Sequence, residues 1–299
     1  TVVYKCIMSI YIRDMAGELG KEVEIKGWLY NKRSSGSIAF LELRDGSGFA
    51  QAVVPKQQVD EKTWQNVEVA TQESSLIVRG KVSQHPKKES EFELQVTAVE
   101  LIQKAEEYPI TKKEHGPDFL MDNRHLWLRS QKQWATLRLR HIVKIGFQDY
   151  FNSHGYIELD TPTFTPNACE GTTDLFEVDY FGRPAYLTQN GQLYLEAMAM
   201  AFGSVYDLCP NFRAEKSKTR KHLTEFWSLN PEMAFVEHEE SLRIQEESIK
   251  HMIGYALKHA GPELAILERD IAQLLAVLNV PFVHYEYEEA IAELQKRGS

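Results

Sequence analysis

The residues best suited to chemistry gather between Pro210 and Glu232. Five basic residues and one acid, Glu215, stand between Asn211 and His222. An arginine such as Arg213 presents a forked set of donors that suits phosphate oxygens, and an aromatic ring can stack on a nucleobase. A positive loop followed by Phe226 therefore favours a nucleotide ligand. Arg213 and Glu215 are two residues apart, which predicts that they share one face of a strand.

A second polar group lies in the segment Leu187–Glu196. The segment begins like a strand, passes through Gly191 and continues as an apolar helix. Gln192 and Glu196 are four residues apart and so share a helix face, while Gln189 precedes the turn. A carboxylate among leucine, methionine and alanine needs a polar partner. We therefore expect a binding role for Glu196.

Two further segments have weaker signals. In Cys169–Phe176, Glu170 stands beside a glycine, where its carboxylate could receive an ammonium group; a solvated loop acid is the alternative. In Gly155–Pro162, a helix ends at glycine and a short strand ends at proline. For this second segment we favour a structural role, with an exposed edge that could serve a subunit interface.

The first hundred residues that precede these segments have a β pattern. Five strand candidates and one helix, around Asp60–Ala70, follow from alternating apolar residues and from the hairpin signal Arg44–Gly48: Val23–Tyr30, Ile38–Leu43, Phe49–Val54, Leu76–Val82 and Phe92–Ile102. A helix before the fourth strand is typical of an OB-fold barrel, although other small barrels have similar spacing.

The second half mixes helices and strands without regular alternation. We expect strands at Tyr156–Leu159, Tyr206–Cys209 and Phe226–Leu229, and helices at Gln131–Phe151, Gln192–Phe202, His238–Lys258 and Glu263–Leu278. This favours an α+β domain with an antiparallel sheet. The expected organisation is a barrel domain at 1–103, a connector at 104–130 that Pro109, Gly116 and Pro117 interrupt, and a second domain at 131–299.

Composition narrows the function classes. The 299 residues carry a net charge of −9, which argues against non-specific coating of nucleic acid, yet residues 123–148 hold six basic residues and no acid. No run of about 18 apolar residues predicts a membrane span. Three cysteines, far apart in the sequence, fit neither a disulfide framework nor paired metal spacing. A cytoplasmic protein is the simplest expectation.

Together these segments resemble one family. The family is the class II aminoacyl-tRNA synthetases, in the asparaginyl/aspartyl subgroup. Its motif 2 is similar to Phe212–Glu215 with Arg220–Phe226, and its motif 1 is similar to Gly155–Pro162. Two of the subgroup's amino-acid-binding segments are similar to Cys169–Phe176 and Leu187–Glu196. Gly27-Trp28, Lys32-Arg33, Phe40, Leu43-Arg44-Asp45 and Gln51 resemble that subgroup's anticodon-binding domain. The resemblance covers nearly the whole chain in family order.

The resemblance implies an OB-fold barrel followed by a class II catalytic domain, which activates an amino acid with ATP and Mg2+ and transfers it to tRNA. It assigns ATP to Arg213, Glu215, Lys221, His222, Leu223 and Phe226, and the amino acid to Glu170, Gln189, Gln192 and Glu196. It assigns the anticodon to Arg33, Phe40, Gln51 and Glu93. A carboxylate at 196 accepts a hydrogen bond from an amide and repels a carboxylate, so asparagine and tRNA(Asn) are the expected substrates.

The family also implies a homodimer through the motif 1 region. The chain departs from the family pattern at Lys221, Asn190, Cys169 and Asn230, where arginine, serine, proline and an acid are usual. Motif 3 and the carboxylates that hold magnesium are expected beyond Ser299, so we expect no metal ligands in this chain. We interpret the chain as a fragment that does not aminoacylate unaided, and Met8 as the natural start.

Three alternatives remain open. The first is an aspartyl enzyme, including a non-discriminating one, which a comparison of adenylation with asparagine and with aspartate would distinguish from an asparaginyl enzyme. A non-catalytic tRNA-binding or dimerisation module would bind tRNA without ATP protecting Phe226 or Arg213. An amidating paralogue that makes asparagine would have no use for an anticodon-type barrel, so the barrel counts against it.

Overall fold

The structure is a computed structural model that describes residues 7–88, 91–111, 113–169, 171, 174–216, 219 and 221–298. The chain forms two compact units, one ending at Asn123 and the other beginning at Arg124. None of the described helices is long and apolar enough to cross a membrane.

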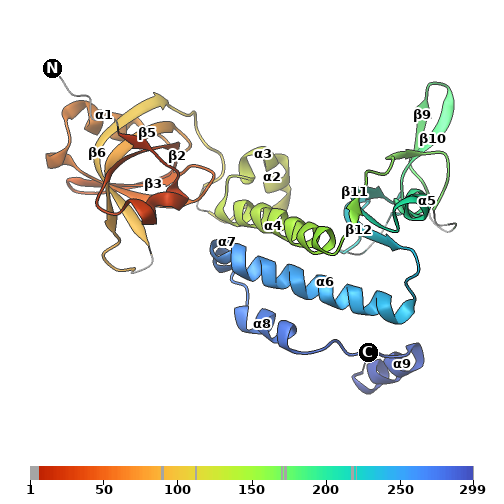
Figure 1. Ribbon diagram of the computed structural model, residues 1–299. Helices are drawn as coiled ribbons and strands as arrows, with labels where there is room; N and C mark the ends of the chain where they lie inside the picture. Colours follow the sequence, from red (N-terminus) through yellow and green to blue (C-terminus); the bar gives the residue numbers. More distant parts are fainter. Residues whose placement is uncertain are drawn as a thin grey trace. The chain divides into compact units, whose positions relative to one another are not determined.

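The first unit is a closed barrel of five strands with a helix on its chain path (Figure 1). Its elements are β2 (Glu22–Ser35), β3 (Ile38–Arg44), β4 (Phe49–Pro55), α1 (Glu61–Val69), β5 (Ser75–Gln84) and β6 (Phe92–Gln103). The strand order is β2-β3-β4-β6-β5, and β5 closes the barrel by pairing with β2. The five predicted strands and the helix before the fourth are confirmed, and Arg44 pairs with Phe49 across the predicted hairpin.

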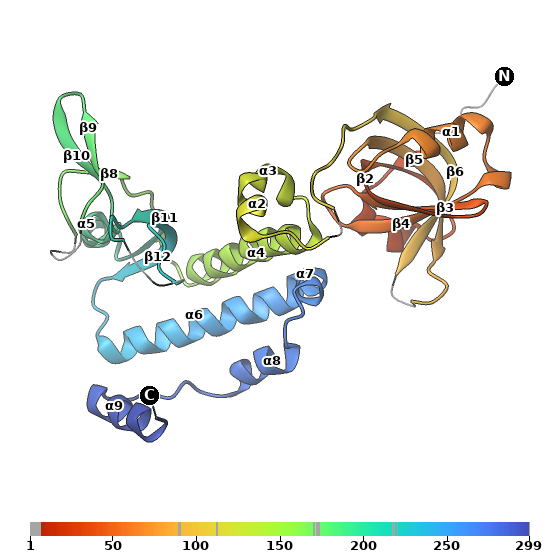
Figure 2. The ribbon, with the colours of Figure 1, turned by 180° about the vertical axis from the view of Figure 1, so that it is seen from behind.

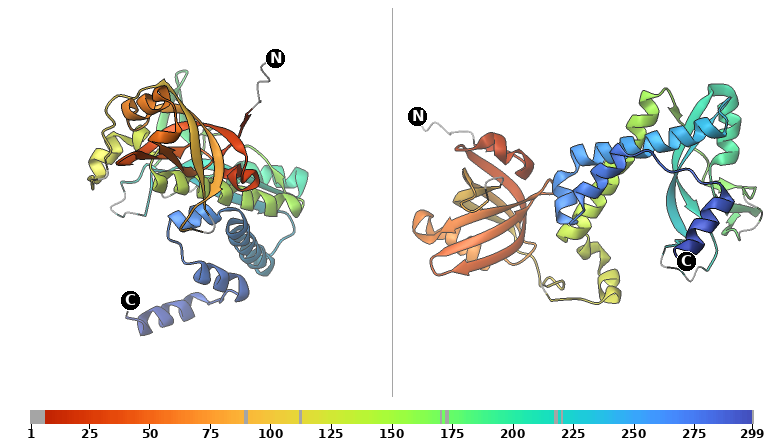
Figure 3. Two further views of the ribbon diagram at one scale, coloured as in Figure 1. Left: turned by 90° about the vertical axis from the view of Figure 1, so that its left-hand side faces the viewer. Right: turned by 90° about the horizontal axis from the view of Figure 1, so that it is seen from below.

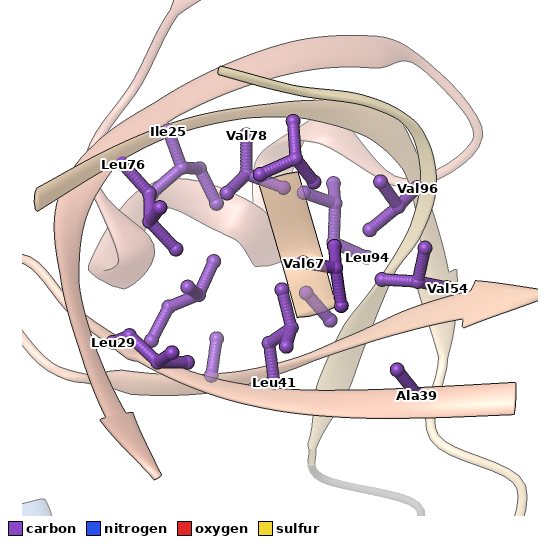
Figure 4. Packing of buried hydrophobic residues seen from close by; sticks show 14 of the residues in the cluster. Ile25, Leu29, Ala39, Leu41, Val54, Val67, Leu76, Val78, Leu94 and Val96 are labelled. Atoms are coloured by element: carbon purple, nitrogen blue, oxygen red, sulfur yellow. The ribbon is translucent and has the colours of Figure 1, made fainter. Parts of the chain in front are cut away.

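Alternation along each strand builds the core of the barrel. Buried residues fall at alternate positions, as in Val23 and Ile25 of β2 and Ala39, Leu41 and Leu43 of β3. Their side chains point into the barrel interior, as those of Leu29, Leu41 and Leu94 do in Figure 4. Shorter elements complete the unit: β1 (Met8–Ser9), the 3-10 helices Ile12–Glu18 and Lys56–Gln58, and α2 (Pro117–Asp122).

The second unit combines helices with two small sheets. Its elements are α3 (Arg124–Trp127), α4 (Gln131–Ser153), β7 (Ile157–Glu158), β8 (Phe164–Thr165), β9 (Glu177–Tyr180), β10 (Arg183–Leu187), α5 (Gln192–Phe202), β11 (Ser204–Phe212), β12 (Glu225–Met233), α6 (His238–His259), α7 (Gly261–Ile266), α8 (Ile271–Asn279) and α9 (Tyr287–Lys296). Strands β11 and β12 are antiparallel, and β7 joins β11 in parallel. Strands β8, β10 and β9 form the other sheet.

Helices α4 and α6 lie side by side (Figure 2, and Figure 3 from below). Ile142 of α4 packs with Ala256 and Ala260 at one end of the pair. At the other end, Tyr150 and Phe151 pack against Tyr206 of β11. This end of the helix pair therefore packs against the face of the β11–β12 sheet that carries Tyr206.

One predicted helix, Glu263–Leu278, is wrong as a single element. The structure has α7 and α8 with a break between them. Glu268 has a positive φ of 51°, and the Asp270 carboxylate accepts a hydrogen bond from the backbone N–H of Gln273, which caps the start of α8. A left-handed residue followed by a new N-cap ends one helix and begins another.

Candidate functional site

All four chemistry-bearing segments meet around β11. Val205 pairs with Ile157 of the Gly155–Pro162 segment, and β12 runs antiparallel to β11 along its whole length. The Phe212 N–H donates to the Thr188 carbonyl oxygen at 2.9 Å. The Ala214 N–H donates to the carbonyl oxygen of Asp174 at 3.1 Å. Backbone hydrogen bonds thus join segments that are far apart in the sequence.

The face of this sheet that lies away from α4 is polar. Asp207, Cys209 and Asn211 alternate along β11 and pair with Asn230, Ser228 and Phe226 of β12. Because strand side chains alternate, these six residues share one face, which we call the site face. Asp207 and Asn211 are only 1% exposed. Burial and the Asp207 carboxylate raise the pKa of the Cys209 thiol to about 11.

The predicted nucleotide residues lie at the open end of this hairpin. Arg213 is half-buried, and its backbone N–H donates to the Thr224 carbonyl oxygen at 2.9 Å. Its guanidinium lies 5.9 Å from the Phe226 ring centroid. The prediction that Arg213 and Glu215 share a strand face is wrong. Strand β11 ends at Phe212, and the chain then leaves the sheet because the Ala214 N–H bonds to Asp174. Glu215 lies exposed in the loop.

The tip of the loop carries the remaining nucleotide candidates. Lys221, His222 and Leu223 are all exposed. The His222 ring bonds to the Thr219 hydroxyl, which also accepts from the Lys221 N–H at 3.3 Å. The hairpin therefore brings these three residues to the same loop as Arg213, with two basic side chains open to solvent.

The amino-acid candidates surround the first turn of α5. Gln189 is buried and accepts a hydrogen bond from the backbone N–H of Cys169 at 3.1 Å, which joins two predicted binding segments. The Gln192 side-chain amide donates to the Glu196 carboxylate at 3.0 Å, so the prediction of a shared helix face is confirmed. Glu170 lies outside the described residues.

Glu196 has a different setting from the expected one. The apolar residues of α5 do not surround it: Leu195 and Ala199 are buried against β11, while Glu196 is exposed and Met200 is 84% exposed. Its polar partner is Gln192. Glu196 is nevertheless close enough to β12 for its charge to act on Glu232. Burial first, and then the charges of Glu196 and Asp207, raise the pKa of the Glu232 carboxyl.

Asp207, Asn230 and Glu232 are site residues that we did not predict. A signal for Asp207 was present, because an acid that alternates with apolar residues inside a strand is unusual. Asn230 was noted only as a departure from the family's acid. The structure shows that its side-chain amide donates to Asp207 at 2.7 Å, from the directly opposite position on β12.

The motif 1 segment is fixed by a buried tyrosine. The Tyr206 hydroxyl lies 3.0 Å from both the Asn152 amide oxygen and the Glu158 carboxylate, and Gln148 donates to the same carboxylate. Burial is the first cause of the raised pKa of Tyr206, so the hydroxyl remains a donor at neutral pH. Among the described strands, β7 is the last in the order β12-β11-β7, and its Ile157 is 43% exposed.

The four residues predicted for the anticodon lie together on the barrel, where Glu93 is only 5% exposed. Arg33 donates to the Gln51 amide oxygen at 3.0 Å, and Gln51 donates to the Glu93 carboxylate at 3.0 Å. The Arg33 guanidinium stacks 4.8 Å from the Phe40 ring centroid. The residues come from β2, β3, β4 and β6, which are neighbours in the strand order. The pairing of these strands brings together donors, acceptors and an aromatic ring, the kinds of group that recognise a nucleobase.

Comparison with known families defines the class of this chain. Residues 23–102 match the family described as OB-fold nucleic acid binding domain, and residues 116–298 match tRNA synthetases class II (D, K and N). The chain is 48% identical over 290 residues to the asparagine–tRNA ligase of Pelotomaculum thermopropionicum, covering 97% of this chain and 67% of that protein. It is also 48% identical to the Sorangium cellulosum asparagine–tRNA ligase, over 95% of this chain and 64% of that protein.

A solved structure agrees with these matches. The asparaginyl-tRNA synthetase from Pyrococcus horikoshii, complexed with asparaginyl-adenylate, superposes with a TM-score of 0.88 at 34% identity, covering 97% of this chain and 67% of that one. The chain belongs to the asparaginyl-tRNA synthetases, and an OB-fold barrel followed by an α+β class II catalytic domain is confirmed as its fold. It spans about two thirds of the length of the relatives it matches.

Proposed function

We propose that the protein activates asparagine with ATP and transfers it to tRNA(Asn). The observation that carries this proposal is the meeting of the four family segments around β11. Arg213 lies beside Phe226, and the Leu187–Glu196 segment is hydrogen-bonded to the same strand through Thr188. The Pyrococcus horikoshii structure, with its bound asparaginyl-adenylate, has the same fold.

In the first step, the asparagine carboxylate attacks the α-phosphate of ATP and pyrophosphate leaves. This reaction needs positioning and charge neutralisation rather than a protein nucleophile. Arg213 binds the α-phosphate, and Phe226, held 5.9 Å from its guanidinium, stacks on adenine. Glu215, Lys221, His222 and Leu223 hold ATP and help to place the tRNA end.

The amino acid occupies the start of α5. Gln189 and Gln192 line the pocket, Glu170 receives the ammonium group, and Glu196 accepts a hydrogen bond from the side-chain amide. In the second step, the terminal ribose hydroxyl of tRNA attacks the adenylate carbonyl, and AMP leaves. On the barrel, Phe40 stacks on an anticodon base while Arg33, Gln51 and Glu93 contact base edges or phosphate.

Three further assignments belong to the same proposal. The domains divide as 1–103, 104–130 and 131–299, the protein forms a homodimer through the motif 1 region, and it acts in the cytoplasm.

Magnesium accompanies ATP in such reactions. Among the described residues, no group of three or more His, Cys, Asp or Glu is placed to hold a metal ion. No step is therefore assigned to a protein-bound metal.

Amino-acid-dependent ATP–pyrophosphate exchange tests the proposal, using the protein encoded by its complete reading frame. We expect exchange with asparagine, and an Arg213→Ala variant should lose about 100-fold, the cost of removing one donor to transition-state charge. Arg183→Ala, in an exposed residue at the start of β10, is the matched control. Exchange with aspartate alone contradicts the proposal, as does tRNA binding without any exchange.

A further inference from the structure

Asp207 carries a buried carboxylate outside the set of predicted residues. Asp207 is 1% exposed, whereas most aspartates lie at the surface. Burying a carboxylate is costly unless its oxygens accept hydrogen bonds. Both oxygens do: Oδ2 accepts from the Thr161 hydroxyl at 2.6 Å, and Oδ1 accepts from the Asn230 amide at 2.7 Å.

The two donors come from different elements. Thr161 belongs to the motif 1 segment that follows β7, and Asn230 lies on β12. Asp207 itself stands on β11, so its side chain joins three segments across the site face. Asn230 also donates to the Ser228 hydroxyl at 3.0 Å, which extends the network along β12.

The backbone at Gly191 also packs closely against the Asp207 carboxylate. A Cβ added to Gly191 would lie 1.9 Å from Asp207 Oδ2 and 2.6 Å from the Thr161 hydroxyl. Only glycine can approach so closely. Gly191 is the residue immediately before α5, and the next residue is Gln192, whose side chain bonds to Glu196. A displacement of Asp207 would therefore move Gly191 and, with it, the first turn of α5, which carries the proposed amino-acid pocket.

We propose that Asp207 is a positioning residue, which holds the Gly191 turn against Thr161 and Asn230 and so fixes Gln192 and Glu196 for asparagine binding. The identity of the ligand as asparagine rests on the proposed function. The role of Asp207 in holding the Gly191 turn rests only on contacts within the chain.

The hydrogen-bond chemistry specifies a swap variant. Asparagine in place of Asp207 offers one acceptor oxygen and one NH2 group, so Asp207→Asn keeps only one of the two acceptors. The new NH2 group then faces either the Asn230 amide or the Thr161 hydroxyl, both of which donate to Asp207 in the wild type. In the double variant Asp207→Asn/Asn230→Asp, the new amide at position 207 would donate to the new carboxylate at position 230. The oxygen of that amide would accept from Thr161, and Ser228 would donate to the carboxylate. The network is kept with one donor and acceptor pair reversed.

The test measures hydrogen–deuterium exchange and steady-state kinetics of the same four proteins. They are the wild type, Asp207→Asn, the swap variant and Asp179→Asn. Asp179 is the control, an aspartate that accepts from the Gly182 N–H in the exposed β9–β10 turn. We expect Asp207→Asn to exchange at least tenfold faster in peptides covering residues 157–162 and 187–196, with the barrel unchanged. The swap variant should return to within threefold of the wild type.

Kinetics separates positioning from general loss of structure. For Asp207→Asn we expect the KM for asparagine to rise about tenfold while the KM for ATP stays within twofold, and the swap variant to recover. Unchanged exchange in both peptides, or a folded swap variant that fails to recover, overturns the proposal. If the wild type shows no asparagine-dependent activity, the proposed function fails, and the exchange data alone still decide the role of Asp207.

Discussion

Replacement of Glu196 by glutamine tests the basis of amino-acid choice. Glutamine keeps the length of the side chain and one acceptor oxygen, so an asparagine amide still finds a partner. It removes the negative charge that opposes a substrate carboxylate. We therefore expect aspartate to become a better substrate, while asparagine changes little.

The exposure of Glu196 limits the size of this effect. Two like charges about 4 Å apart repel by about 1 kcal/mol in water and by about 4 kcal/mol at an effective dielectric constant of about 20. Glu196 is exposed, so the lower part of this range applies, about 1 to 2 kcal/mol. Since about 1.4 kcal/mol is tenfold, the preference for asparagine over aspartate should fall by about 5- to 30-fold.

The assay is pyrophosphate exchange with each amino acid, compared as kcat/KM. Glu196→Lys should shift the preference further towards aspartate, because it replaces repulsion with attraction. Glu288→Gln, in an exposed residue of the first turn of α9, is the control and should leave the ratio unchanged. A ratio within twofold of the wild type in Glu196→Gln, with an unchanged melting temperature, would refute the electrostatic argument.

Two further predictions concern stability. In the barrel, both Arg44 Nη atoms bond to the Glu73 carboxylate at 2.8 Å, and the two side chains are 7% and 3% exposed. Glu73→Gln replaces the carboxylate that faces the buried Arg44 charge with a neutral amide, and it should lower the free energy of unfolding by about 3–5 kcal/mol in chemical denaturation. The double variant Arg44→Met/Glu73→Leu should restore most of this loss. A loss under about 1 kcal/mol in Glu73→Gln contradicts the prediction. In the second unit, the pKa of Glu232 is raised by burial, Glu196 and Asp207, so its ionisation opposes folding. The contribution of Glu232 to stability is fully present below the carboxyl pKa of the unfolded chain. It is lost as the pH rises from that value through the raised pKa of the folded protein. Glu232→Gln should therefore melt at a higher temperature than the wild type at pH 8 and at the same temperature at pH 4; equal melting at pH 8 contradicts the assignment.

The elements that the sequence predicts well have strong local signals. Strands β2 to β6 alternate apolar and polar residues. Helix α1 begins directly after its N-cap Asp60, whose carboxylate accepts a hydrogen bond from the Thr63 N–H. The β9–β10 hairpin was not predicted because its signals are weak. Its strands are short and mostly exposed, and Phe181 and Gly182 both have positive φ, although phenylalanine is rarely found there.

The site is less accessible to sequence reasoning than the fold. The family motifs assign Arg213, Phe226 and Gln192 to one site, because motifs found in the family's order imply the family's fold. They say nothing of Asp207, whose role depends on which residue lies opposite it and which turn packs over it. Both facts arise from pairing between residues far apart in the sequence. Local periodicity does not contain them.

The register of β11 and β12 links these observations. Asp207 lies opposite Asn230, and the same alternation carries Asn211 opposite Phe226, next to Arg213. A slip of one residue would turn one strand's set of side chains to the other face. Asp207 would then lose its amide donor, and Phe226 would leave the side of the sheet on which the guanidinium lies. One register therefore sets the proposed asparagine pocket and the proposed adenine contact together, so a variant that disturbs the pairing should impair both substrates, whereas Asp207→Asn should impair asparagine alone.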